Sequence, residues 1–467
     1  MSNADPHKDE IRGVQRRIAR ELLRLTDARY ISGQVVPPPP YVRRHLAEHA
    51  HAGGVLDNHT VPDQFLPYID LPRLRELTAQ QQPPDATTTN ADKRLPLLPV
   101  LRRMSHFWDF ARPAANTCAL QAWAVAAGHR PFDPGELEPW KALWAYWRKE
   151  AGEILGSHTS AVFAVATTVL HGRPVAVTGS SDATVRIWDL TTGHPTGESL
   201  TGHTGAVRAV ATTVLPDGRA VAVTGSEDAT VRIWDLSTGH PLGDPLTGHT
   251  SWVRAVATTE LPDGRAVAVT GSDDVTVRIW DLSTGRPTGD PLTGHTSWVR
   301  AVATTELPDG RAVAVTGSED RTVRIWDLST GHPLGEPLTG HTRAVGAVAT
   351  TVLPDGRAVA VTGSEDATVR IWDLSTGHPT GEPLTDHTGP VLAVATTVLP
   401  DGRAVAVTGS SDATVRIWDL ESRRPVGHPL PVTAAVEGVA LTRSGGEFVA
   451  VIVGDGVARI DVRVESW

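Results

Sequence analysis

The sequence predicts an all-β repeat fold in its last two thirds, preceded by an α-helical region. The tetrapeptide Ile-Trp-Asp-Leu occurs six times, and its tryptophans stand 46 residues apart along the chain. Each copy also contains short runs of Val, Ala, Thr and Ile separated by turn residues. A fixed period of this length indicates an array of equivalent supersecondary units.

Residues 248–293 illustrate one unit. Three runs of alternating small and β-branched residues are interrupted by Pro-Asp-Gly-Arg and by Gly-Ser-Asp-Asp, and a short fourth run follows. Short β-rich segments between turn signals form antiparallel strands. Each unit is therefore predicted to be a four-stranded antiparallel sheet.

The Gly-His that opens each unit and the Trp-Asp that closes its third run resemble the WD-repeat β-propeller family over residues 152–467. In that family a buried tetrad of His, Ser or Thr, Asp and Trp holds each blade together. The resemblance implies six tetrads: His158, Thr178, Asp182, Trp188; His203, Thr224, Asp228, Trp234; His249, Thr270, Asp274, Trp280; His295, Thr316, Asp320, Trp326; His341, Thr362, Asp366, Trp372; His387, Thr408, Asp412, Trp418. Ser157 and Asp386 replace the Gly before the His in two copies.

An Asp, a His and a hydroxyl together could indicate nucleophilic catalysis. Six equivalent copies that each end on an indole donor favour a structural network instead. Truncating one member would leave a buried partner unsatisfied, at a cost of about 1–3 kcal/mol.

The last unit, residues 434–462, is degenerate, because Ile460 stands at the Trp position and no His matches. No fourth run follows it, whereas residues 152–155 align with the fourth run at 197–200. We expect residues 152–155 to complete the last blade, because a closed ring leaves no strand edge exposed. The predicted fold is a seven-bladed WD-repeat β-propeller at 151–467, with six intact blades and one degenerate hybrid blade. This hybrid blade is the expected weak point.

Residues 1–150 are predicted to form an α-helical arm domain. Helical periodicity covers residues 5–25 and 41–58, on either side of four prolines at 37–40. A polar, Pro-bearing linker at 80–93 precedes three further predicted helices at 95–112, 113–128 and 134–150. In the last of these, Trp140, Trp144 and Trp147 would share one helical face and pack in the core or against the propeller.

Charge is divided unevenly between the two parts. Residues 1–150 contain 20 Lys+Arg against 17 Asp+Glu, and residues 151–467 contain 23 against 36 and no lysine. Such an acidic domain is a poor candidate for nucleic-acid binding, which depends on clustered cations. With a single cysteine, Cys118, and neither a signal peptide nor a long apolar run, we expect a cytoplasmic protein without membrane contact.

Residues 41–50 and 138–166 resemble the helical segment that leads into the WD-repeat sensor of bacterial STAND (NACHT-type) signalling NTPases. In that family the sensor holds a nucleotide-binding switch inactive until a trigger binds. None of the four lysines follows a glycine, so the sequence contains no phosphate-binding Gly-Lys-Ser/Thr loop. The resemblance therefore extends to the sensor half alone.

The near-identical copies can be compared with one another. They differ three and five residues after the His and just before the turn Asp, which by resemblance lie on the top face around the central opening. The expected partner-binding residues there are Trp252, Trp298, Arg208, Arg254, Arg300, Arg321 and Arg343, with an apolar shoulder of Phe163, Pro390 and Leu392. Trp and Arg are the commonest interface hot spots, and Arg can bind a carboxylate through two donors. An acidic or aromatic-bearing protein segment is the implied ligand.

A second interpretation assigns these arginines a structural role. Each Arg of the arc occurs with an acid before the turn of its own unit: Arg208 with Glu227, Arg254 with Asp273 and Arg300 with Glu319. Exposed ion pairs of this kind contribute about 0–1 kcal/mol each and would cancel part of the positive field. This structural interpretation does not account for the indoles of Trp252 and Trp298, which have no comparable partner in the sequence pattern.

We expect neither metal nor cofactor. His45 and His49 are spaced to bind a metal from one helical face, but without further ligands a solvated helix is favoured. The predicted function is non-enzymatic protein recognition, as the sensor or partner-binding component of a bacterial STAND-like signalling or defence system. The alternatives are a general assembly scaffold, holding two proteins on opposite faces, and an enzyme that uses the propeller channel.

Overall fold

The computed structural model describes residues 6–23, 29–31, 34–36 and 40–52, isolated positions between 56 and 120, residues 140–147, and residues 158–462 apart from 400, 433, 445 and 446. The chain divides into two compact units, Met1–Lys141 and Ala142–Trp467. Of the helices in the described part, none combines the length and apolar character that a membrane crossing requires.

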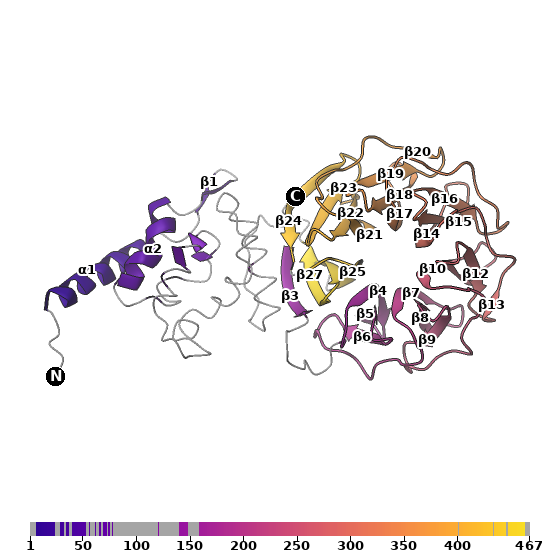
Figure 1. Ribbon diagram of the computed structural model, residues 1–467, viewed down its shortest axis with the longest axis horizontal. Helices are drawn as coiled ribbons and strands as arrows, with labels where there is room; N and C mark the ends of the chain where they lie inside the picture. The colour runs from indigo at the N-terminus through magenta and orange to yellow at the C-terminus, as the bar shows by residue number, and fades with distance from the viewer. Residues whose placement is uncertain are drawn as a thin grey trace. The chain divides into compact units, whose positions relative to one another are not determined.

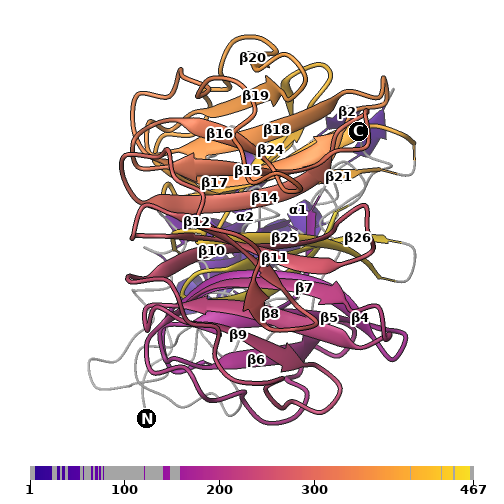
Figure 2. The same cartoon turned by 90° about the vertical axis from the view of Figure 1, so that its right-hand side faces the viewer.

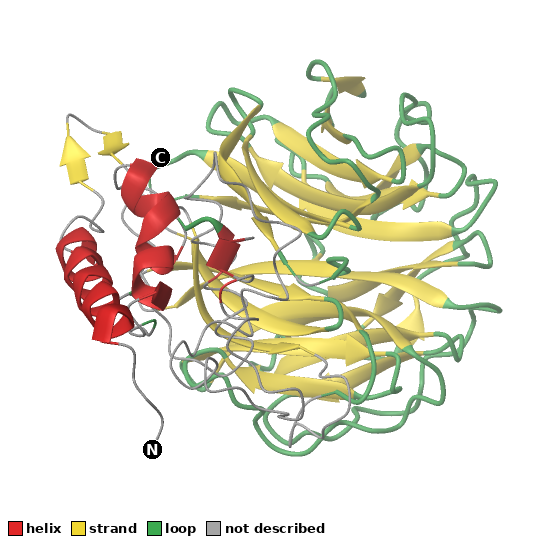
Figure 3. Cartoon of the chain, turned by 60° about the vertical axis from the view of Figure 1, so that its left-hand side comes forward, coloured by secondary structure: helices red, strands yellow, loops and turns green. Residues whose placement is uncertain are grey.

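The continuous described segments of the N-terminal unit form two helices and a small hairpin. Helix α1 (Pro6–Leu23) packs against α2 (Pro40–Ala52), and β1 (Arg29–Ile31) pairs with β2 (Gln34–Val36) between them in sequence (Figure 3). Helix α2 begins at the last of the four prolines, where a missing N–H costs nothing. Two of the five predicted helices are therefore present, whereas 80–93, 95–112 and 113–128, apart from Leu120, lie outside the described residues.

The second unit consists of seven antiparallel sheets that follow one another around a ring (Figure 1). Their innermost strands, in chain order, are β4 (Val162–Leu170), β7 (Val207–Val214), β10 (Val253–Glu260), β14 (Val299–Glu306), β17 (Val345–Val352), β21 (Val391–Val398) and β25 (Gly438–Ser444). The second strands are β5 (Arg173–Ser180), β8 (Ala220–Ser226), β11 (Ala266–Ser272), β15 (Ala312–Ser318), β18 (Ala358–Ser364), β22 (Ala404–Ser410) and β26 (Glu447–Val453). The third strands are β6 (Val185–Asp189), β9 (Val231–Asp235), β12 (Val277–Asp281), β16 (Val323–Asp327), β19 (Val369–Asp373), β23 (Thr414–Asp419) and β27 (Gly456–Val462). We number the sheets one to seven from β4.

The fourth strand varies in length. It is a full strand or a two-residue pair in four sheets: β13 (Arg286–Pro287), β20 (His378–Pro379), β24 (Arg424–Pro431) and β3 (Trp140–Trp147). In the first, second and fourth sheets two isolated bridges stand in its place, such as Val185 with Leu200 and Trp188 with Pro195. The predicted short fourth run thus forms the outer edge of each repeat.

Consecutive sheets pack face to face, and Figure 2 shows them next to one another in chain order. One core cluster joins Val221 and Val223 of the second sheet to Val256, Ala268 and Trp280 of the third. The tryptophan of the Ile-Trp-Asp-Leu tetrapeptide is about 1 % exposed in every repeat, as Trp280 is. Burying an indole removes about 150–250 Å² from water, worth roughly 4–6 kcal/mol before entropic costs. The Trp of every unit therefore fills the space between two sheets.

The last sheet has the order β25-β26-β27-β3, so a segment that precedes the ring in sequence forms its outermost strand (Figure 1). Two expectations need correction here. The predicted helix at 134–150 is wrong, because residues 140–147 are a strand. The position beside β27 that we assigned to residues 152–155 belongs to β3, and 152–155 lie outside the described residues. The spacing of residues 140, 144 and 147 fits one face of a helix, whereas aromatic residues favour strands, so the two sequence signals disagreed.

A line of threonine hydroxyls connects the innermost strands. Thr212 Oγ1 donates to the carbonyl of Thr167 at 3.0 Å, and Thr258 Oγ1 donates to that of Thr212 at 3.1 Å. The same bond recurs at the next three joints and from Thr167 to Leu441 of the seventh sheet at 2.9 Å. Leu441 has no hydroxyl, so the joint between the sixth and seventh sheets lacks this bond.

Candidate recognition surface and the buried tetrads

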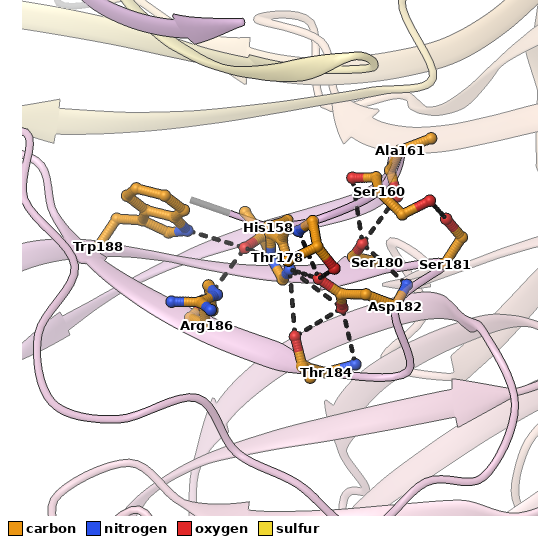
Figure 4. A network of polar contacts seen from close by, with 11 residues as sticks. His158, Ser160, Ala161, Thr178, Ser180, Ser181, Asp182, Thr184, Arg186 and Trp188 are labelled. Carbon is orange, nitrogen blue, oxygen red and sulfur yellow. Dashed lines mark hydrogen bonds and ion pairs between the residues drawn. The ribbon is translucent and has the colours of Figure 1, made fainter. Parts of the chain in front are cut away.

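The structure brings each predicted tetrad together between the first three strands of its sheet. In the first sheet, Trp188 Nε1 donates to Thr178 Oγ1 at 2.8 Å, and His158 Nε2 lies 2.8 Å from the same oxygen (Figure 4). His158 Nδ1 lies 3.1 Å from Asp182. In the other five tetrads, those of sheets two to six, the indole bond measures 2.8–2.9 Å and the His–Asp contact 2.8–3.0 Å.

The second tetrad shows how protons are arranged in such a network. Burial lowers the pKa of His203, although Asp228 opposes this shift, so the imidazole is neutral at pH 7. Burial alone would raise the pKa of Asp228, but hydrogen bonds from Thr230, Thr204 and His203 outweigh it and lower the pKa to about 2. Nδ1–H of the neutral ring then donates to Asp228, and Nε2 accepts the hydroxyl of Thr224, which in turn accepts the indole N–H.

Every tetrad threonine is fully buried. Its oxygen is already bonded to both the indole and the imidazole, so it has neither access to a substrate nor a free base to activate it. This geometry makes the tetrads structural staples.

The sequence reasoning missed one further member of each network. Thr184, two residues after Asp182, donates its hydroxyl to Asp182 Oδ1 at 2.6 Å, and the backbone N–H of Thr159 donates to Oδ2 at 2.9 Å. Equivalent hydroxyl bonds of 2.6–2.7 Å occur in all the other five tetrads. The signal was present as an Asp-x-Thr in all six copies, a pattern that forms Asx turns.

The position five residues after the His coincides with a β-bulge at the start of the innermost strand. In the third sheet the register shifts between Val253 and Ala255, and Arg254 is the extra residue. Bulges at the same place in the other five intact repeats carry Phe163, Arg208, Arg300, Gly346 and Leu392. A bulge redirects a side chain out of the regular pleat, which explains why this position varies while its neighbours do not.

Six side chains of the first four sheets form an alternating row of aromatic rings and guanidinium groups, which we call the rim ladder: Phe163, Arg208, Trp252, Arg254, Trp298 and Arg300. The Arg208 guanidinium carbon lies 3.8 Å from the ring centroid of Phe163 and 5.7 Å from that of Trp252. Arg254 stands 4.8 Å from Trp252 and 5.4 Å from Trp298, and Arg300 stands 5.8 Å from Trp298. Each such contact contributes about 0.5–1 kcal/mol at an exposed site.

The ladder arginines are also held by carboxylates. Arg254 binds Asp273 through two bonds of 2.8 and 3.0 Å, and Arg208 Nε donates to Glu227 at 2.8 Å. Arg300 binds Glu319 at 2.7 Å and, across the joint, Glu365 of the fifth sheet at 2.6 Å. The distances therefore support the ion-pair interpretation of Arg208, Arg254 and Arg300, and the charges of these three side chains are neutralised.

What the ladder presents to solvent is its indoles. Trp252 is 38 % exposed and Trp298 is 39 % exposed. The side chains of the other expected site residues lie outside the ladder: Arg321 is exposed in the turn after β15, Arg343 is exposed before β17, and Pro390 and Leu392 are half-buried at the start of β21. The seventh sheet contributes an acid, Glu437, whose pKa is raised by burial and by Asp455, although the charge of Arg208 lowers it in part.

His45 and His49 of α2 are engaged in contacts of the N-terminal unit. The two ring nitrogens of His49 contact Gln15 of α1 at 2.5 Å and the Tyr41 hydroxyl at 3.0 Å, and His45 contacts Glu48 at 2.7 Å. Within the described residues, no group of three or more His, Cys, Asp or Glu could hold a metal ion.

Comparison with known proteins agrees with the geometry of the repeats. The WD domain, G-beta repeat family matches six segments, 151–189, 195–235, 239–281, 286–327, 331–373 and 377–419, which together make up more than half of the chain. Among curated proteins, no match was found. With its ring of antiparallel sheets and its six stapling tetrads, the chain belongs to the WD-repeat family and has a WD-type β-propeller.

Proposed function

We propose that this protein is a non-enzymatic recognition module that binds a segment of a partner protein on the indole faces of Trp252 and Trp298. WD repeats generally mediate protein–protein interaction or scaffolding. The observation that carries the proposal is the exposure of these two indoles, 38 % and 39 %, whereas the other apolar side chains of the rim, Phe163, Pro390 and Leu392, are half-buried.

The rim ladder holds the two indoles in place before any partner arrives. Trp252 lies between Arg208 and Arg254, and Trp298 lies between Arg254 and Arg300. Because carboxylates fix the arginines in turn, binding would cost little side-chain entropy. Rigid, partly exposed tryptophans of this kind are the residues that dominate interface energetics.

The ion pairs change the expected chemistry of the ligand. The three ladder arginines are neutralised, so the aromatic or apolar part of a partner segment would supply most of the binding energy. Among the described residues, Arg321 and Arg343 are exposed and remain for a carboxylate of the partner. The proposal thus retains the acidic or aromatic segment, with the indoles as the main anchor.

The finer part of the proposal is a closed seven-bladed ring that acts as a cytoplasmic sensor in a STAND-like bacterial system. It is supported by the resemblance of residues 41–50 and 138–166 to the sensor entry of those NTPases. Its test is whether the protein binds a separately made STAND-type NTPase and changes its rate of nucleotide turnover. An unchanged rate, with no binding, would leave recognition without this signalling role.

The recognition site is tested by affinity capture from the native cell extract followed by mass spectrometry. The Trp252→Ala, Trp298→Ala double variant removes both indoles, and it should fold, because the first, second and fifth sheets already carry Ala161, Ala206 and Ala344 at this position. The Trp252→Phe, Trp298→Phe double variant is the matched control that retains stacking. We expect partners that the wild-type protein and the Phe variant capture and the Ala variant loses. If the Ala variant captures the same proteins, the ligand binds elsewhere.

A further inference from the structure

A fourth variable position lies at the other end of the innermost strands. It is occupied in sheets one to seven by Val169, Val214, Glu260, Glu306, Val352, Val398 and Arg443, a set that we call the lower rim. The residues around it, Thr-Thr before and Leu after, are the same in all six intact repeats. The chain thus varies this position while it keeps the strand that presents it in all six intact repeats and the Pro-Asp-Gly-Arg turn in five of them.

The lower rim and the rim ladder are on opposite faces of the ring. In β10, Arg254 of the ladder and Glu260 of the lower rim are six residues apart on one extended strand. At about 3.3 Å per residue this places them roughly 20 Å apart. A ligand on one face therefore leaves the other face accessible.

The four valines of the lower rim are unusually open to solvent. Val169 and Val214 are each 55 % exposed, Val352 is 44 % exposed and Val398 is 39 % exposed. A single exposed valine needs no explanation. These four, however, occupy equivalent places around one ring, and the position accepts a charged residue without difficulty, because Glu260 and Glu306 stand there in the third and fourth sheets. Exposed apolar side chains that recur at a position compatible with charge indicate an interaction surface.

The charge of this face is concentrated at the two glutamates. The adjoining Pro-Asp-Gly-Arg turns neutralise themselves, since Asp and Arg of each turn form an ion pair of 2.6–2.8 Å. Arg443 is placed over the Phe448 ring at 4.7 Å. Glu260 and Glu306 are exposed and have no ion-pair partner among the described residues. Read around the ring, the lower rim is two valines, two acids, two valines and one cation, Arg443, whose guanidinium contacts the Val398 carbonyl away from the two glutamates.

We propose that the lower rim is a second docking surface, for a protein segment that carries Lys or Arg side chains flanked by aliphatic ones. The cations would face Glu260 and Glu306, and the aliphatic side chains would cover Val214 and Val352 on either side. Complementary charge steers such a segment into place, and burial of the valines holds it. With a different ligand on the rim ladder, the protein could hold two partners at once, which favours the scaffold as its second role. The inference rests on the lower rim alone and is independent of what binds the tryptophans.

The test selects a displayed random-peptide library on the immobilised full-length protein and measures the recovered peptides by fluorescence polarisation. The decisive variant is Glu260→Val, Glu306→Val, which gives the third and fourth sheets the residue that four other sheets already have and so should fold. We expect peptides rich in Arg or Lys and Leu, Ile or Val, whose affinity falls at least about tenfold in this variant. The complementary Val214→Ser, Val352→Ser variant should weaken the same peptides by removing their apolar contacts without a change of charge.

The Trp252→Ala, Trp298→Ala variant is the control, and it should bind these peptides as the wild-type protein does. The proposal is overturned if no recovered peptide loses affinity in the glutamate variant, or if the peptides that do are acidic. It is also overturned if the tryptophan variant abolishes the same binding, because a single site would then explain everything. Weaker binding at raised salt in the wild-type protein alone would further support the charge-based part of the contact.

Discussion

Thr270 is the residue through which the structure makes its sharpest prediction about stability. Its hydroxyl accepts the Trp280 indole N–H at 2.9 Å and contacts His249 Nε2 at 2.7 Å, and the side chain is fully buried. The Thr270→Val substitution keeps the shape and removes only the hydroxyl. It leaves one buried donor and one buried acceptor without partners.

The expected cost follows from those two groups. Each unsatisfied buried group costs about 1–3 kcal/mol, and the added methyl returns a little through burial. We therefore expect the Thr270→Val substitution to lower the free energy of unfolding by about 2–4 kcal/mol, measured by urea unfolding of the full chain with circular dichroism. The Thr259→Val variant is the control, because the Thr259 hydroxyl makes only a 3.5 Å contact with the Glu260 carbonyl. It should change the free energy by less than about 0.5 kcal/mol.

A double-mutant cycle with Trp280→Phe separates the hydrogen bond from general packing. When the indole N–H is already absent, removal of the Thr270 hydroxyl leaves one buried group fewer without a partner. The double variant should therefore be less destabilised than the sum of the two single variants, by about 1 kcal/mol. The seventh sheet shows that an apolar arrangement is workable, because Ile460 fills the Trp position at 1 % exposure. If Thr270→Val and Thr259→Val behaved alike, or if the cycle were additive, the tetrad would not be the staple described above.

Three further perturbations test other parts of the ring. The Leu441→Thr substitution supplies a hydroxyl opposite the Thr396 carbonyl and should raise the free energy of unfolding by about 0.5–1 kcal/mol. The control Leu441→Val should give no such gain. Equal urea midpoints for the two variants would contradict a stabilising role for the line of threonine hydroxyls. The pKa of His203 lies below its usual 6.5 and that of Asp228 is lowered to about 2, so at acid pH the unfolded chain binds more protons than the folded one. The free energy of unfolding should therefore fall as pH drops below 6.5 and again below about 4. A urea midpoint that rose between pH 7 and pH 3 would contradict this pH dependence. Val275 has a left-handed φ of 68°, which is strained for a β-branched residue, so Val275→Asn should raise the melting temperature by relieving about 1 kcal/mol; a lower melting temperature would show that the Val side chain contributes more than the strain costs.

The repeats explain why so much of the ring was accessible from the sequence. The four residues His, Thr, Asp and Trp recur at the same positions in all six copies, which identifies them as a set. The strand β3 was not accessible, since its tryptophans have the spacing of a helical face and its partner β27 lies more than 300 residues away in sequence. Pairing over such a distance leaves no local signal.

The functional surfaces show a similar division. Comparing the copies located Trp252 and Arg254 as variable, but whether the arginine was free or paired depended on atomic geometry that no pattern contains. The lower rim was missed for a different reason. Its change from Val to Glu in the third and fourth sheets stands in the sequence, yet it becomes meaningful only when the exposure of Val214 and Val352 is known.

The interrupted line of threonine hydroxyls gives this ring a beginning and an end. Six of its joints are built by the same bond in the same direction, so any intact sheet could accept any other as its neighbour. Such interchangeability invites mispairing in an array of near-identical repeats. The joint between the sixth and seventh sheets lacks this bond, and only the seventh sheet takes its outer strand from the front of the chain. Assembly therefore finishes at the one sheet that is built from both ends of the chain, and that sheet is where the ring is expected to open first.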